Sequence, residues 1–340
     1  MKAVRYHEHG GPEVLRYEDA PDPAPQDGAA LVRVRACALN HLDLWHRRGI
    51  PGMTISLPRI GGSDVAGEIV DGGASGLAAG TRVMLQPGIS CGRCFLCLAG
   101  RDNECASYAV LGTREQGGCA ELVAVPVANL IPIPDQIDFV KAAAFPLTFV
   151  TAWHMLITRA GLKAGETVLV LAAGSGVGQA AIQIANLHGA RVLATAGTAE
   201  KVERARALGA HEVINHHTED LPARVRQLTS KRGVDVVVEH VGEATWDRSL
   251  RCLAPSGRLV TCGATTGYQG HIDLRFLFVR QLSLLGSFMG TKGELLTAAQ
   301  FFFRGDLEPV VDQVFLPADA VAAHAHLERA GQFGKVVLSW

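Results

Sequence analysis

Short segments with strand-like character fill the first third of the chain. In these segments β-branched or aromatic residues recur, and clusters of Gly, Pro or Asp separate one segment from the next. The candidate strands are residues 1–6, 14–18, 31–38, 65–70 and 81–85. Residues 40–48 have helical spacing instead, with Leu42 and Trp45 as the apolar positions. The pattern predicts an irregular antiparallel barrel or sandwich.

The rhythm changes at about residue 148, where apolar runs begin to alternate with helical segments. The predicted strands are 167–171, 191–195, 212–214, 234–238 and 258–262, and the predicted helices are 178–187, 199–208, 220–229 and 244–253. Runs such as VLVL and VDVVV show no polar alternation, which indicates strands buried on both faces. We therefore predict an α/β domain with a doubly wound parallel sheet.

The alternation of strands and helices stops after Gly286. The remaining pattern predicts helices at 295–304 and 318–329 and strands at 310–315 and 335–339. A chain of 340 residues is long enough for two domains. We expect the tail to rejoin the first domain, so that 1–147 and 287–340 form one domain and 148–286 the other.

Composition and charge narrow the class of protein. Hydrophobic residues make up 48% and charged residues 19% of the chain, which is enough apolar material for packed cores. The net charge of -1 argues against binding of nucleic acid or of anionic membranes. The first residues turn polar too early for a signal peptide, and no apolar run is long enough to cross a bilayer. We expect a soluble, cytoplasmic protein that acts on a small molecule.

A glycine-rich loop follows the predicted strand 167–171 and opens a helix. Its sequence, AAGSGVG over residues 172–178, has the strand–loop–helix setting that pyrophosphate binding requires. Glycines there let the backbone approach a dinucleotide, and the helix N-terminus offers N–H groups and a positive dipole end. The predicted cofactor-binding residues of the loop are Gly174, Ser175, Gly176, Val177 and Gly178. The alternative is a purely structural turn.

The end of the next strand bears on which nicotinamide cofactor binds. An acidic residue at its tip would bond the ribose 2′-hydroxyl and repel a 2′-phosphate, but residues 194–198 contain no carboxylate. Thr198 and Lys201 are suited to hold a 2′-phosphate, although Glu200 lies between them. We therefore predict NADPH in preference to NADH.

Four of the eight cysteines fall within one short loop, residues 91–105. They are Cys91, Cys94, Cys97 and Cys105. Four thiolates suit a tetrahedral Zn²⁺ site, and such a site is closed to substrate, so its role is structural. An iron–sulfur cluster and disulfides are the competing interpretations. We predict one structural zinc ion.

Together, the glycine loop, the four-cysteine loop and the order of the two domains resemble the medium-chain dehydrogenase/reductase superfamily, in its zinc-type alcohol dehydrogenase family. The resemblance covers essentially the whole chain. It implies a GroES-like, β-barrel-type catalytic domain and an inserted Rossmann cofactor domain, with the active site in the cleft between them. It also implies an NAD(P)-dependent oxidoreductase.

The residues that bind catalytic zinc in that family are absent here. Asn40 stands in place of the first ligand, a cysteine, and Ser63 in place of the second, a histidine that a glutamate follows. The segment 145–148 at the domain junction offers neither thiol nor imidazole for the third. Without these ligands the chain lacks the Lewis acid on which alcohol oxidation depends in those enzymes.

Three segments are similar to the quinone oxidoreductase branch of the superfamily. They are Asn40-x-x-Asp43-x-x-x-Arg47-x-Gly49, Ala173-x-x-Gly176-x-Gly178 and Thr151-Ala152-Trp153. The resemblance implies reduction of quinones or α,β-unsaturated carbonyls by NADPH without catalytic zinc, in an enzyme that keeps the structural zinc lobe. It also implies assembly into a homodimer or homotetramer.

The same resemblance suggests roles for single residues. Asn40 would donate to the acceptor oxygen or the cofactor ribose, Ser63 would relay a proton, and Asp43 would hold Asn40 or Arg47 in place. The further cofactor contacts that it implies are Val241 on the adenosine side, Gly263 and Ala264 beside the nicotinamide, Lys335 at the pyrophosphate and His216 near the 2′-phosphate.

Two other functions stay open on the sequence. One is an alcohol dehydrogenase with an atypical metal site, whose candidate ligands are His41, Asp43, Asp64 and His154. The other is a protein that binds NADPH without catalysis, since a fold does not dictate a function. Metal content separates the reductase from the alcohol dehydrogenase: one zinc ion per chain fits the reductase, and two fit the alcohol dehydrogenase.

Overall fold

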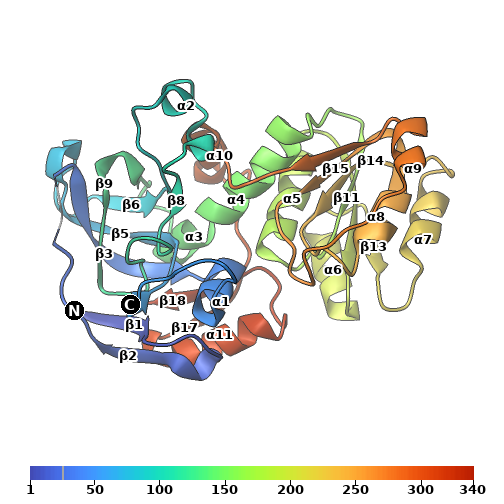
Figure 1. The fold of residues 1–340 in the computed structure, drawn as a ribbon. Coiled ribbons are helices and arrows are strands. Elements are labelled where there is room, and N and C mark those ends of the chain that lie inside the picture. Colours follow the sequence, from blue (N-terminus) through green and yellow to red (C-terminus); the bar gives the residue numbers. More distant parts are fainter. Residues whose placement is uncertain (25–26) are drawn as a thin grey trace. The chain divides into compact units, whose positions relative to one another are not determined.

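The chain folds into two compact units, which we describe from a computed structural model of residues 1–24 and 27–340 (Figure 1). One unit comprises Met1–Leu147 and Thr291–Trp340, and the other comprises Thr148–Gly290. The predicted division after residue 286 therefore lies four residues before the division found in the structure.

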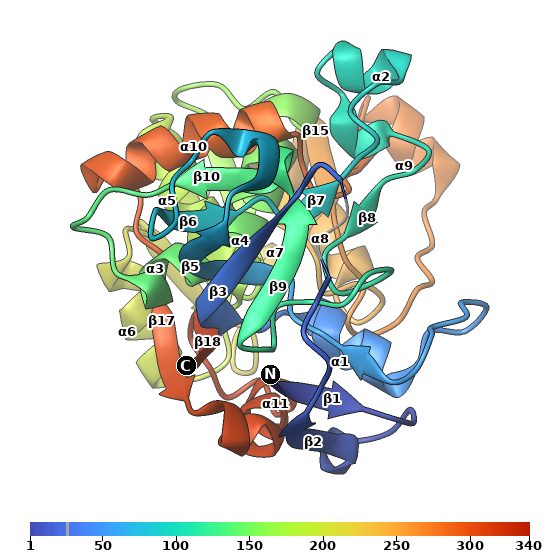
Figure 2. The same cartoon turned by 90° about the vertical axis from the view of Figure 1, so that its left-hand side faces the viewer.

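Most strands of the first unit form one mainly antiparallel sheet. Its strands are β3 (Ala29–Ala38), β5 (Asp64–Asp71), β6 (Arg82–Leu85), β9 (Leu122–Pro126), β10 (Leu130–Pro132), β17 (Val311–Phe315) and β18 (Lys335–Ser339). The order is β10-β6-β5-β3-β18-β17, and β9 also pairs with β3 (Figure 2). The C-terminal strand β18 pairs with β3 in register Val337 to Ala38, so the tail joins this sheet.

Smaller sheets and short helices complete the first unit. One sheet has the order β2-β1-β4, and β7 pairs with β8. Their strands are β1 (Lys2–Tyr6), β2 (Leu15–Asp19), β4 (Arg59–Ile60), β7 (Gly88–Ile89) and β8 (Ala109–Val110). The helices are α1 (His41–Arg48), α2 (Phe95–Leu98), α3 (Phe139–Ala144), α10 (Lys292–Arg304) and α11 (Ala320–Glu328). Short 3₁₀ turns occur at Pro12–Val14, Gly73–Ser75, Asp102–Glu104, Val127–Asn129 and Pro317–Asp319.

The core of the first unit lies between the sheet and the elements that cover it. Val32, Val34 and Ile69 point inward from β3 and β5, and Leu338 from β18 joins the same buried cluster. The helix α3 packs on β3 and β5, whereas α11 packs on β18 and β2. Burial of these side chains stabilises the fold by about 25 cal/mol for each Å² of apolar area removed from water.

The second unit has a parallel sheet, as predicted, in the order β13-β12-β11-β14-β15-β16. Five of its six strands were predicted, and the edge strand β16 was not. The strands are β11 (Thr167–Val170), β12 (Arg191–Ala196), β13 (Glu212–Asn215), β14 (Val234–Glu239), β15 (Leu253–Thr261) and β16 (Ser283–Gly286). The helices are α4 (Pro146–Trp153, which begins in the first unit), α5 (Gly176–Leu187), α6 (Ala199–Ala207), α7 (Leu221–Leu228), α8 (Trp246–Cys252) and α9 (Leu274–Val279), with a π-helical turn at His154–Arg159. The strand order reverses between β11 and β14, which marks the edge where ligands bind in such sheets.

Polar N-cap side chains begin several of the helices. Ser175 caps α5, Thr198 caps α6, and Asp220 caps α7, each by accepting a backbone N–H of the first turn. Thr291 and Glu294 form a capping box at α10. The predicted start of α5 at Gly178 is two residues late, because the cap at Ser175 begins the helix at Gly176. In the described part of the chain no helix is long and apolar enough to cross a membrane.

Candidate functional site

The glycine loop after β11 has the conformation that anion binding needs. The Ser175 hydroxyl accepts a hydrogen bond from the Gly178 N–H at 2.8 Å, which fixes the first turn of α5. A Cβ at Gly178 would lie 2.3 Å from the Ala172 carbonyl oxygen, so only glycine fits there. Ala172 itself adopts φ 46°, and its N–H donates to the Thr195 hydroxyl. The loop thus presents a helix N-terminus suited to a pyrophosphate.

A second loop, after β14, is tied to the glycine loop. His240 Nε2 lies 2.9 Å from the Ser175 hydroxyl. The carboxylate of Glu239 is fully buried and accepts from the N–H groups of Val241 and Gly242 and from the Thr245 hydroxyl. Burial raises the pKa of Glu239. Glu239 and His240 were not among the predicted site residues, although polar residues at the end of an apolar strand are a signal that the sequence offers.

The predicted residues Gly263 and Ala264 follow β15, so they lie at the same edge of the sheet as Val241 and the glycine loop. A Cβ built at Gly263 would lie 3.3 Å from the carbonyl oxygen of His240, which places these two loops side by side. Three neighbouring strands of the sheet, β11, β14 and β15, therefore deliver the glycine loop, Val241, Gly263 and Ala264 to one edge.

Basic side chains gather beyond β12. Thr198 Oγ1 accepts from the Lys201 N–H at 3.2 Å, and a Cβ at Gly197 would meet Nε2 of both His216 and His217 at 3.0 Å. Burial lowers the pKa of His216, and repulsion by the charges of His217, Arg248 and Lys201 lowers it further. The carboxylate of Glu200 is 80% exposed and faces Arg204 at 3.7 Å. The acidic residue of this segment is therefore turned toward its own helix.

In the first unit, Asp43 fixes the turn that carries Asn40. Its carboxylate accepts from the Asn40 N–H and from the Gly62 N–H, both at 2.8 Å. Burial raises the pKa of Asp43, and these two hydrogen bonds oppose that effect. Of the two roles expected for Asp43, its contacts fit the one of holding Asn40. Arg47 has other partners, including His324 Nδ1 and the Glu328 carboxylate.

Asn40, Asp64 and Lys335 form a buried hydrogen-bonded network. Lys335 Nζ donates to Asn40 Oδ1 at 2.6 Å and to Asp64 Oδ2 at 2.9 Å, and Asn40 Nδ2 donates to Asp64 Oδ2 at 2.9 Å. Their exposed fractions are 8%, 0% and 2%. The resemblance implies Lys335 at a cofactor pyrophosphate, and that role stays a prediction. In the structure its ammonium bonds Asn40 and Asp64, because β18 runs beside β3.

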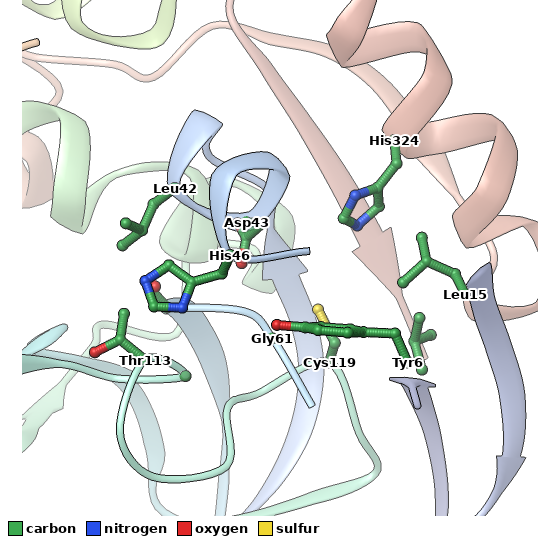
Figure 3. A pocket seen from close by; sticks show the side chains of 12 residues that line it. Tyr6, Leu15, Leu42, Asp43, His46, Gly61, Thr113, Cys119 and His324 are labelled. Carbon is green, nitrogen blue, oxygen red and sulfur yellow. The ribbon is translucent and has the colours of Figure 1, made fainter. Parts of the chain in front are cut away.

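Ser63 lies at the wall of a small cavity in the first unit. Its hydroxyl donates to the Leu111 carbonyl oxygen at 2.8 Å, and the residue is 1% exposed. The cavity has a volume of about 20 Å³, enough for about one water molecule. Figure 3 shows the Tyr6 hydroxyl pointing toward Gly61 and the His46 ring below Leu42, both at this cavity. Within the described residues, Tyr6 Oη and His46 Nδ1 have no hydrogen-bond partner.

The cysteine loop meets the requirements of a closed zinc site. The four sulfur atoms lie within 4.8 Å of one another. N–H groups of Arg93 and Cys94 donate to Cys91 and lower the pKa of its thiol to about 6, which favours the thiolate that binds zinc. Over residues 1–24 and 27–340 this is the one group of three or more side chains placed to hold a metal ion. His41, Asp43, Asp64 and His154 form no such group.

Comparison with known proteins gives the chain relatives over its whole length. Residues 26–135 match the family model described as alcohol dehydrogenase GroES-like domain, and residues 176–304 match the zinc-binding dehydrogenase model. Quinone oxidoreductases from Pongo abelii and Pseudomonas aeruginosa are each 33% identical over 99% of this chain, which covers 97% and 99% of their lengths. A crystal structure of an NAD-dependent alcohol dehydrogenase is 46% identical, with a TM-score of 0.97 and full coverage of both chains.

The zinc lobe gives a first prediction. Cys97→Ser removes one of four thiolate ligands, so we expect zinc content to fall well below that of the wild type and the melting temperature to fall with it. Metal analysis and calorimetry measure both. Cys252→Ser is the control, because Cys252 is buried in the core of the second unit and its loss lowers stability without removing zinc. Full zinc retention in Cys97→Ser would contradict the site.

Proposed function

The chain belongs to the medium-chain dehydrogenase/reductase superfamily, in its zinc-type alcohol dehydrogenase family. On that premise we propose that it transfers hydride from NADPH to a quinone or an α,β-unsaturated carbonyl. In this proposal the protein holds one structural zinc ion and no catalytic one. The curated relatives named quinone oxidoreductase support this class of acceptor.

The network of Asn40, Asp64 and Lys335 is the observation that carries the proposal. By the resemblance, Asn40 and Ser63 stand where zinc alcohol dehydrogenases have ligands of the catalytic zinc, and a lysine ammonium bonds the adjacent carboxylate of Asp64. An amide, a hydroxyl and an ammonium do not match the thiolate, imidazole and carboxylate ligands of zinc, and the one carboxylate of the network, Asp64, is already bonded to the Lys335 ammonium. These residues therefore do not fit a catalytic metal ion.

An electron-poor acceptor needs little activation. Reduced nicotinamide, when bound, supplies the hydride. We assign to Asn40 the hydrogen bond to the oxygen on which negative charge develops, a role in which one donor is worth about 10²–10³ in kcat. Asp43 holds the Asn40 backbone for this task. The Ser63 hydroxyl donates to the Leu111 carbonyl oxygen, so it can relay a proton only if it gives up this hydrogen bond and donates to the substrate instead.

The basic cluster after β12 supports NADPH as the cofactor. Thr198, Lys201 and His216, with His217 and Arg248 nearby, place positive or hydrogen-bonding groups where an NAD enzyme has an acidic residue. We assign the pyrophosphate to the residues 174–178 and the remaining cofactor contacts to Val241, Gly263 and Ala264. A cytoplasmic location and a homodimeric or homotetrameric assembly stay predictions.

An NAD-dependent alcohol dehydrogenase is the second candidate, which the name of the 46% identical structure favours. That activity would need a second metal ion bound by residues such as His41 and Asp64. In the structure the carboxylate of Asp64 is instead bonded to the Lys335 ammonium. A third function, binding of NADPH without catalysis, predicts tight binding and no turnover.

The proposed activity is tested with a panel of quinones and cyclic enones, using NADPH oxidation as the readout. We expect reduction of at least one acceptor class, at rates that a chelator of loosely held metal leaves unchanged. The matched assay offers primary and secondary alcohols with NAD⁺ and NADP⁺. Faster alcohol oxidation with NAD⁺, lost on metal removal, would overturn the proposal.

Cofactor preference gives a separate prediction. Lys201→Ala should raise the Kd for NADPH about tenfold or more, because a charged hydrogen bond to phosphate is worth about 1.5–3 kcal/mol, and should leave the Kd for NADH nearly unchanged. Fluorescence titration measures both constants. Lys163→Ala serves as control, because Lys163 is exposed and precedes β11, whereas Lys201 follows the parallel strand β12 at the opposite edge of the sheet. An equal loss of affinity for the two cofactors would refute the 2′-phosphate assignment.

A further inference from the structure

The carboxylate of Asp64 needs a cation. It is fully buried, and a buried unpaired carboxylate is strongly unfavourable. Oδ1 accepts from the Leu147 N–H at 2.8 Å, and Oδ2 accepts from Lys335 and Asn40. Lys335 is 2% exposed, so the two charges are removed from solvent together. The pair therefore places an ammonium and a carboxylate, both shielded from solvent, against the Asn40 amide.

The pair also determines which way the Asn40 amide faces. An ammonium only donates hydrogen bonds and an ionised carboxylate only accepts them. Because Asn40 contacts both, its Oδ1 must face Lys335 and its Nδ2 must face Asp64. This orientation leaves the second N–H of Nδ2 as the donor that Asn40 can offer. Its backbone is held as well, by the bond from the Asn40 N–H to Asp43.

We propose that the Lys335 ammonium is the resident cation of the candidate active site and that, with Asp64, it locks Asn40 as a hydrogen-bond donor toward the reacting oxygen. The inference rests on the proposed function and identifies Lys335 and Asp64 as positioning residues for it. Lys335 acts through Asn40 and takes the place that a metal ion has in zinc-dependent relatives.

A purely structural ion pair makes a different prediction. Neutral replacement of a buried pair commonly costs little stability, whereas removal of one partner costs much. In the double variant Asp64→Asn with Lys335→Met, both charges of the pair are removed, and the buried Asp43 carboxylate keeps its bonds to the Asn40 and Gly62 N–H groups. The oxygen of the new amide at position 64 must still accept from the Leu147 N–H, so its NH₂ faces Asn40. Asn40 then turns its oxygen toward position 64, and its orientation is reversed.

The experiment compares wild type, both single variants and the double variant. We expect each single variant to lower Tm by about 10 °C and the double variant to regain most of that loss. In the double variant kcat should remain about 100-fold below wild type, with KM for the acceptor little changed, because the lost donor acts on the transition state. Lys163→Met, the same change at an exposed site, should match wild type in both respects. Recovery of both Tm and kcat in the double variant would overturn the inference.

A second measurement does not depend on activity. NMR of protein with isotope-labelled lysine side chains should show one slowly exchanging ammonium that disappears in Lys335→Met. Absence of such a signal in the wild type would also overturn the inference. If the wild type reduces no quinone or enone, the proposed function fails, whereas the ammonium signal and the Tm cycle still decide whether Lys335 is the resident cation.

Discussion

A carboxylate without access to water constrains the whole first unit. Asp64, at the start of β5, is stable there only with a cation and several donors around it. The donors come from distant parts of the chain: Asn40 follows β3, Leu147 lies in α4, and Lys335 begins β18. These bonds therefore tie the C-terminal strand to the segments after β3 and in α4, in addition to the backbone pairing of β18 with β3. The same bonds define the polar centre of the candidate site.

In the second unit, too, side-chain oxygens hold loops in place by accepting hydrogen bonds from backbone N–H groups. Ser175 binds a backbone N–H of the glycine loop, and Glu239 binds two backbone N–H groups of the next loop. Such bonds fix loop conformation before any ligand arrives, which reduces the entropy lost on binding. Gly178 is required because no side chain fits beside the Ala172 carbonyl. The loops at this edge of the sheet are therefore held in one conformation where we propose that the dinucleotide binds.

The sequence predicts those features that depend on neighbours along the chain. Apolar runs such as Val234–Val238 predicted the parallel strands. The spacing from Cys91 to Cys105 predicted that the four sulfur atoms lie close together. Strands of two or three residues, such as β4 and β10, carry no periodic signal and were not predicted. The place of Lys335 was missed for a different reason. The resemblance implied a cofactor contact for Lys335, and its burial against Asn40 and Asp64 depends on the pairing of β18 with β3, which no pattern along the chain shows.

The central claim is that an ammonium, and not a metal ion, is the cation of the candidate active site. The most direct test is the metal content of wild-type protein purified without added zinc, measured per chain by mass spectrometry. The account predicts one zinc ion, bound by the four cysteines. Two metal ions per chain, with the second lost together with activity on dialysis against a chelator, would contradict it.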